Sequence, residues 1–169
     1  MKLKTALASM LLLAVVVAGG ALGGRADAEQ PSQEVAATEQ NTAQASWHTD
    51  WEAAAKDSET SGKPILIDFT GSDWCIWCIR LKQEVFDTPE FQAWAQDNVV
   101  LLELDFPRNS EQSEEMKRKN EELAQKYNIE GFPTILFTDH KGEVIGRYGY
   151  DEGGPATWIP KAEELLGSK

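Results

Sequence analysis

The sequence predicts an α/β domain with a mixed central sheet and helices on both faces. Short apolar runs typical of buried strands alternate with longer amphipathic runs typical of helices. The last two apolar runs are separated only by a turn, which indicates an antiparallel hairpin. A chain of 169 residues is long enough for one domain with a substantial core and too short for two.

The first 28 residues have the pattern of a secretory signal peptide. Lys2 and Lys4 precede an apolar run over 6–22, and the small-x-small pattern of a cleavage site follows at 26–28. This pattern predicts a periplasmic or secreted protein. The alternative is an uncleaved N-terminal membrane anchor, because the apolar run is near the lower limit for crossing a bilayer.

Residues 29–46 consist mainly of small and polar residues and predict a disordered spacer, so the folded domain should occupy 47–169. The chain carries a formal net charge of −12 at pH 7. Such an acidic protein is not expected to bind nucleic acid or an anionic membrane surface. We expect a monomer whose partners are proteins.

Capping residues and periodicity define the predicted elements. Thr49 or Asp50 can cap a helix that Gly62 ends, and Asp73 can cap a later one. Pro89 fits the first position of another helix. No strand is evident before the first helix. The predicted helices are 50–61, 75–86, 88–96, 113–127 and 155–166, and the predicted strands are 65–69, 99–106, 134–138 and 143–148.

The two cysteines point to chemistry more than to cross-linking. Cys75 and Cys78 are the only cysteines, and a disulfide between them closes too small a loop to stabilise the fold by much. Cys75 begins a predicted helix, where free N–H groups and the helix dipole favour a thiolate. Cys78 shares an apolar row with Leu81 and Val85. We therefore predict that Cys75, open to solvent, attacks a substrate disulfide and that buried Cys78 resolves the mixed disulfide.

Asp68 is the candidate base that accepts the proton of Cys78. It is the one acid in the apolar strand 65–69, and burial there should raise its pKa toward neutrality. The alternative is an acid at the strand end that contacts water or caps the following loop.

Three stretches, 65–69, 73–78 and 127–134, resemble the thioredoxin superfamily. The sequence Trp74-Cys75-Ile76-Trp77-Cys78 is similar to the active site of bacterial exported thioredoxin-like proteins. The resemblance covers roughly 47–168. It departs from the family in the gap between the buried acid and the first cysteine, which is seven residues here and usually six.

The resemblance implies a thioredoxin fold and several further site residues. A cis peptide bond should precede Pro133 and face the cysteines, and Pro133 should keep metals away from them. The backbone of Phe132 should pair with an extended substrate. Trp74 and Trp77 would form an apolar rim that binds substrate; alternatively, Trp74 packs on the core and Trp77 has no role.

Together these features predict a thiol–disulfide oxidoreductase that acts on exported proteins. A reductase that a membrane electron donor reduces again is favoured, because an oxidising compartment would otherwise trap the pair as a disulfide. The alternatives are an oxidase or isomerase, a non-catalytic module that binds clients, and an inert disulfide. No cofactor or metal is expected, since zinc needs four ligands and His48 and His140 are distant in sequence from the cysteines.

Overall fold

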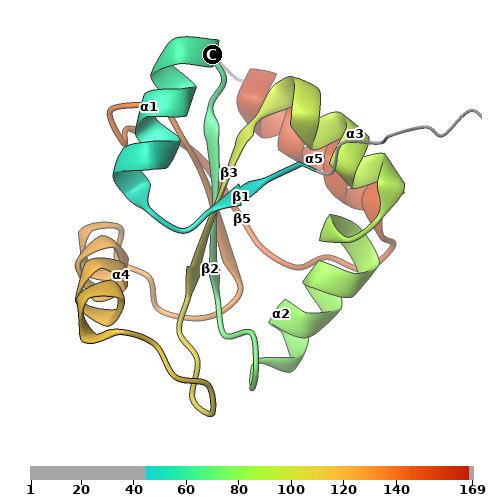
Figure 1. The fold of residues 1–169 in the computed structure, drawn as a ribbon. Helices are drawn as coiled ribbons and strands as arrows, with labels where there is room; N and C mark the ends of the chain where they lie inside the picture. Colours follow the sequence, from blue (N-terminus) through green and yellow to red (C-terminus); the bar gives the residue numbers. More distant parts are fainter. Residues whose placement is uncertain (1–44, 168–169) are drawn as a thin grey trace, which may run out of the picture. The chain divides into compact units, whose positions relative to one another are not determined.

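The computed structural model describes residues 45–167 (Figure 1). The predicted signal peptide and the spacer up to residue 44 lie outside the described residues. Ala45, which the sequence analysis placed in the spacer, is described, and its backbone N–H donates a hydrogen bond to Gln92 at 2.8 Å. Within 45–167, no helix has both the length and the apolar character needed to cross a bilayer.

A five-stranded mixed sheet forms the centre of the domain, in the order β1-β3-β2-β4-β5. The strands β1 (Trp47–His48), β3 (Val100–Asp105) and β2 (Ile65–Thr70) are parallel. The strands β4 (Thr134–Thr138) and β5 (Val144–Tyr148) form an antiparallel hairpin, and β4 also pairs antiparallel with β2. The mixed sheet and its terminal hairpin confirm the predicted fold class.

Helices cover both faces of this sheet, which Figure 1 shows edge-on. One face is covered by α1 (Trp51–Ser61) and α4 (Glu114–Lys126). The other face is covered by α2 (Ile76–Leu81), α3 (Pro89–Asn98) and α5 (Pro155–Gly167). The arrangement follows from strands that are apolar on both sides and must therefore be buried on both sides.

Alternation along β2 divides the apolar side chains between two cores. Ile65, Ile67 and Phe69 pack toward α1 and α4, whereas Leu66 packs toward the other three helices. This second core contains a cluster of aromatic rings around Trp158 of α5, which is fully buried. The aromatic rings packed around Trp158 are those of Phe86, Phe91, Trp94, Phe137 and Tyr148.

Local capping chemistry sets the ends of the first helix as predicted. A side-chain oxygen of Asp50 accepts the N–H of Ala53 at 3.1 Å, and Gly62 ends α1 in the left-handed conformation with φ of 73°. The predicted helix over 75–86 is less regular. It changes after α2 into a π-helix, η1 (Lys82–Phe86), which the Asp87 N–H closes by donating to the Lys82 carbonyl at 2.8 Å.

The strand β1 is an element that the sequence analysis missed. Trp47 pairs with Leu101 of β3, and its ring centroid lies 5.2 Å from that of Phe86. Two residues are too few to show any hydrophobic periodicity. Only the pairing with β3 therefore reveals this strand.

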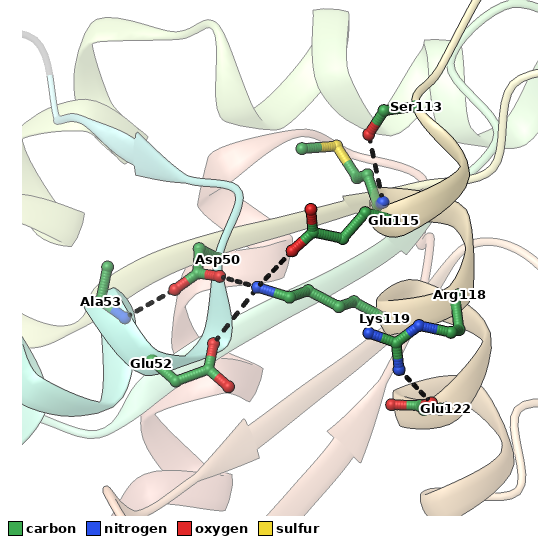
Figure 2. Close-up of polar contacts among 9 residues, drawn as sticks. Asp50, Glu52, Ala53, Ser113, Glu115, Arg118, Lys119 and Glu122 are labelled. Atoms are coloured by element: carbon green, nitrogen blue, oxygen red, sulfur yellow. Dashed lines mark hydrogen bonds and ion pairs between the residues drawn. The ribbon is translucent and has the colours of Figure 1, made fainter.

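A lysine joins α4 to the start of α1 (Figure 2). The Nζ atom of Lys119 lies 3.0 Å from Asp50, 3.8 Å from Glu115 and 4.0 Å from Glu52. Asp50 uses its other oxygen to cap α1 at Ala53. The hydrogen bond from Lys119 is the main reason why the pKa of Asp50 is lowered. The same carboxylate thus caps the start of one helix and binds a side chain of another.

Candidate active site

The candidate site lies at the carboxyl ends of β2 and β3. Thr70, the last residue of β2, pairs with Asp105, the last residue of β3. On the other side of β2, Phe69 pairs with Thr134, the first residue of β4. The turn after β2, the loop after β3 and Pro133, which precedes β4, therefore meet at one end of the sheet. In Figure 1 this is the lower end, where the green turn and the yellow loop lie.

The two cysteines form a disulfide at the start of α2, with their Cα atoms 5.2 Å apart. Cys75 is the N-cap residue, and its Sγ atom accepts a hydrogen bond from the backbone N–H of Cys78 at 3.2 Å. A donor of the first helical turn is thus directed at the Cys75 sulfur, an arrangement that stabilises a thiolate. The prediction that Asp73 caps this helix is wrong, because Cys75 occupies the capping position.

The prediction that Cys75 is open to solvent is wrong for the oxidised protein. Only 6% of Cys75 is exposed, against 3% of Cys78. Cys75 caps α2 and is bonded to a buried partner, so little of it reaches the surface. The exposed part of the motif is Ile76 and Trp77, at 60% and 48%. The surface that the motif presents is therefore formed mainly by these two apolar side chains.

Residues 105–110, which we call the strap, bind the turn that carries the cysteines. The Asp73 carboxylate accepts three consecutive backbone N–H groups of the strap, those of 108–110, at 2.7–2.9 Å. These bonds, the one from Arg108 foremost, lower the pKa of Asp73. At the other end of the strap, Asp105 accepts the N–H and the hydroxyl of Ser72 at 2.9 and 2.6 Å.

Trp74 is held by the strap and by the cis-proline segment. Its indole N–H donates to the carbonyl oxygen of Phe106 at 2.8 Å, and the guanidinium of exposed Arg108 lies 3.5 Å from its ring centroid. The Phe132 ring meets the indole edge-on at 5.8 Å. The peptide bond between Phe132 and Pro133 is cis, which confirms what the family resemblance implied.

Trp77 belongs to a different group of side chains, together with Arg80, Glu84 and Tyr150. The sequence analysis did not assign these neighbours to the site. Its ring lies 5.4 Å from that of Tyr150, and the Arg80 guanidinium lies 5.4 Å from both ring centroids. Glu84 accepts hydrogen bonds from the Tyr150 hydroxyl at 2.7 Å and from Arg80 at 2.8 Å. These two bonds lower the pKa of Glu84. Trp77 is therefore held in place although half of it is exposed.

Asp68 and Cys78 line one cavity of about 220 Å³. Asp68 is 5% exposed, and among the described residues no protein group donates a hydrogen bond to its Oδ1 atom. Burial raises the pKa of Asp68 well above the ordinary aspartate value, and the charge of neighbouring Glu103 raises it further. Although seven residues and not the usual six separate Asp68 from Cys75, Asp68 still lines the same cavity as Cys78.

Three further charged residues of this cavity, Glu103, Lys82 and Asp87, were missed from sequence. Glu103 pairs in register with Asp68 on the neighbouring strand, and Lys82 enters from η1. Burial raises the pKa of Glu103 as well. The same signal that identified Asp68, an acid within an apolar strand, was present for Glu103 in the run 99–106.

Fold and site together define a class: a thioredoxin-fold protein with a Cys-x-x-Cys disulfide at a helix start and a cis-proline at the same end of the sheet. The family model of the thioredoxin-like domain matches residues 51–153. The chain therefore belongs to the thioredoxin-like family.

Several proteins similar to this chain are named as disulfide reductases, oxidoreductases or thiol:disulfide interchange proteins. The disulfide bond reductase DsbH of Chlamydia pneumoniae is 38% identical over 119 residues, which are 69% of this chain and 72% of that protein. The solved structure of a DsbH oxidoreductase is 32% identical with a TM-score of 0.70, over 86% of this chain and 96% of that one. The thiol:disulfide interchange protein DsbD of Cronobacter sakazakii is 34% identical over 88 residues, 52% of this chain but only 14% of that protein. Family membership and the cysteine pair make this chain a protein-disulfide oxidoreductase.

Proposed function

We propose that the protein is an exported reductase of protein disulfides, with Cys75 as nucleophile, Cys78 as resolving thiol and Asp68 as base. The observation that carries this proposal is the hydrogen bond from the Cys78 N–H to the Cys75 sulfur. It makes the two sulfurs unequal, because the fold supplies a donor to a Cys75 thiolate. Cys78, at 3% exposure, shares its cavity with a carboxyl group instead.

The reaction has two exchange steps. The Cys75 thiolate attacks a substrate disulfide, forms a mixed disulfide and releases the first substrate sulfur as a thiolate that takes a proton from water. Cys78 then gives its proton to the Asp68 carboxylate and attacks the Cys75 sulfur. The bond between Cys75 and the substrate breaks, and the second substrate thiolate leaves. The substrate disulfide is reduced to a dithiol and the protein dithiol is oxidised to the disulfide.

The proposed substrate-binding residues are Trp74, Trp77, Phe132 and Pro133. The contact between the rings of Trp74 and Phe132 supports a continuous apolar surface next to the cysteines. The exposure of Trp77 leaves one of its sides free to contact a bound polypeptide. The backbone of Phe132 would pair with an extended substrate segment, and Pro133 would exclude metals from the cysteines.

Three arguments support the reductive direction and the exported location. A relative of this chain is named a disulfide bond reductase. Ile76 and Trp77 bring no charge and no imidazole donor that would stabilise the reduced form strongly, as a strong oxidant requires. The N-terminal pattern of charge, apolar run and small residues supports export. A membrane electron donor would then have to keep the pair reduced.

The reduction potential tests the direction. The protein is equilibrated with glutathione buffers, and its reduced fraction is read by trapping free thiols with an alkylating reagent. We expect a potential below about −150 mV, on the side of the scale where thioredoxin lies. A higher potential would contradict the reductive direction and favour a disulfide oxidase. In the variant Cys78→Ser, mixed disulfides with substrate should persist, whereas Cys75→Ser should form none.

The low exposure of Cys75 favours a second candidate, a module that binds clients through Ile76 and Trp77 without redox turnover. Alkylation of the reduced protein at pH 6 separates the two candidates. Selective modification of Cys75, faster than that of free cysteine, supports the enzyme. A Cys75 no more reactive than free cysteine supports the binding module.

A further inference from the structure

The cavity beside Cys78 brings together charged groups from three segments of the chain. Asp68 comes from β2, Glu103 from β3, and Lys82 and Asp87 from η1 and the residue that follows it. The cavity has a volume of about 220 Å³, which leaves room for water molecules between these groups. It therefore offers a polar route from the buried thiol of Cys78 toward the surface.

Two of the three acids that line this cavity, Asp68 and Glu103, are neighbours across the sheet. Asp68 and Glu103 occupy paired positions on adjacent parallel strands, and such positions point to the same face of a sheet about 4.8 Å apart. Both are largely removed from water, and like charges at this spacing oppose each other. Ionising both at once is therefore costly, and for each group burial and the neighbouring acids raise the pKa.

The cation of the cavity connects it to solvent. The side chain of Lys82 is 53% exposed, and its Nζ atom lies 3.1 Å from the Asp87 carboxylate. Its positive charge favours the ionised forms of Asp68 and Glu103 and so lowers the pKa of each. Lys82 is thus positioned where a proton would pass between the buried acids and water.

We propose that Glu103 and Lys82 are positioning residues for the resolving step: Glu103 shares the proton that Asp68 takes from Cys78, and Lys82 promotes its release to solvent. This inference rests on the proposed function, in which Cys78 attacks the mixed disulfide. The Cys78 proton moves to Asp68, passes to Glu103 or a water molecule, and leaves the cavity at Lys82. The bonds that form and break between sulfur atoms are the same as in the two exchange steps described above.

The signs of the two residues' effects make the proposal testable. The groups that act on the charge of Asp68 are Glu103 and Asp105 from β3 and Lys82 from η1; Asp87 acts on Glu103. The resolving rate should rise with pH as Asp68 ionises. Glu103→Gln removes a repelling charge and should move this rise to lower pH. Lys82→Met removes an attracting charge and should move it to higher pH.

The experiment mixes reduced protein with 5,5′-dithiobis(2-nitrobenzoate) in a stopped-flow instrument over a range of pH. Attack by Cys75 releases one coloured thiolate at a rate that depends on the reagent concentration. Attack by Cys78 then releases the second at a rate that does not. Asp68→Asn should slow the second phase by about 100-fold and replace the rise that follows Asp68 ionisation by one that follows ionisation of Cys78 itself. Glu103→Gln and Lys82→Met should shift the midpoint of the second phase in opposite directions, by a few tenths of a pH unit or more.

Matched controls come from α4, where Glu114 and Lys117 form an exposed ion pair at 2.8 Å. Glu114→Gln and Lys117→Met make the same changes of charge away from the cavity, and neither should move the second-phase midpoint. The inference would be overturned if the two cavity variants moved the midpoint in the same direction. Shifts of the midpoint no larger than those of the controls would also overturn it. Absence of any second phase in the wild-type protein would instead overturn the proposed function.

The wild-type protein provides an independent test in case the cavity variants do not fold. The carboxyl carbons of Asp68 and Glu103 can be followed by ¹³C NMR as the pH changes. We expect the two signals to titrate together in two steps, as interacting groups do. Independent single-step titrations at ordinary carboxyl pKa values would overturn the shared proton.

Discussion

The guanidinium of Arg108 lies over the indole of Trp74, 3.5 Å from the ring centroid. Trp74 immediately precedes the proposed nucleophile, whereas Arg108 belongs to the strap that follows β3. The strap also binds the Trp74 indole N–H through the Phe106 carbonyl and holds Asp73 by three backbone donors. The surroundings of Cys75 are therefore fixed by a loop more than 30 residues further along the chain.

Arg108→Ala should free the indole of Trp74. Loss of the cation–π contact should lower the free energy of unfolding by about 0.5–1 kcal/mol and change the tryptophan fluorescence of the native protein. Urea unfolding followed by fluorescence measures both effects. Arg118→Ala is the matched control, because the Arg118 guanidinium binds only the exposed side chain of Glu122 among the contacts described. Equal effects of the two variants would contradict a specific role for Arg108.

The contribution of Asp73 to stability should depend on pH. Hydrogen bonds from the strap, led by the Arg108 N–H, hold its pKa below the ordinary value of 3.8 in the folded protein. A group whose pKa is depressed by folding stabilises the protein above its unfolded pKa and loses this effect as the pH falls through the folded pKa. Asp73→Asn should therefore be less stable than wild type at pH 7, and the difference should shrink below pH 3.8. Urea unfolding at both pH values measures it; a constant difference would contradict this account.

Gly71→Ala should disturb the site through a steric clash. A Cβ atom at this position would lie 2.6 Å from atoms Cε2 and Nε1 of the Trp74 indole, closer than real contacts allow. The indole would have to move, and its hydrogen bond to Phe106 would break. We expect altered tryptophan fluorescence and a changed alkylation rate of reduced Cys75. Gly131→Ala is the control, because a Cβ atom there has open space around it.

Two variants can separate the two roles of Asp50, which caps α1 and binds Lys119 of α4. Asp50→Ala removes both the helix cap and the ion pair with Lys119 and should cost about 1 kcal/mol of unfolding free energy, most of it from the cap. Asp50→Ser keeps a capping oxygen but loses the charge, so its stability should stay close to wild type. Thermal unfolding compares them. If the serine variant were as unstable as the alanine variant, the ion pair with Lys119 would be the dominant interaction.

The sequence contained the information for most elements because their signals are local. Helix ends followed from Asp50, Gly62 and Thr88, whose side chain or backbone geometry determines where a helix can begin or stop. The strand β1 could not be found in this way, since two residues acquire their structure only by pairing with β3. The π-helical turn η1 could not be found either, because the apolar periodicity of 75–86 fits an uninterrupted α-helix.

At the site, the sequence identified the groups that belong to one motif and missed those that arrive from elsewhere. Asp73 looked like a helix cap, but its carboxylate is used by backbone donors of a distant loop. Arg80 and Tyr150 meet at Trp77 only because α2 and the segment after β5 lie together in the fold. Glu103 is the exception: the sequence analysis missed it, although an acid within the apolar run 99–106 is the same local signal that identified Asp68.

The position of Trp158 affects where this domain can be cut for expression. The family match ends at residue 153, whereas Trp158 lies on α5 and fills the middle of the aromatic core. A fragment trimmed to 51–153 would leave a hole the size of an indole against Phe86 and Phe91 and would also lack β1. Fragments meant for crystallisation or NMR should therefore extend at least from residue 45 to residue 167, and the shorter one should yield aggregated protein.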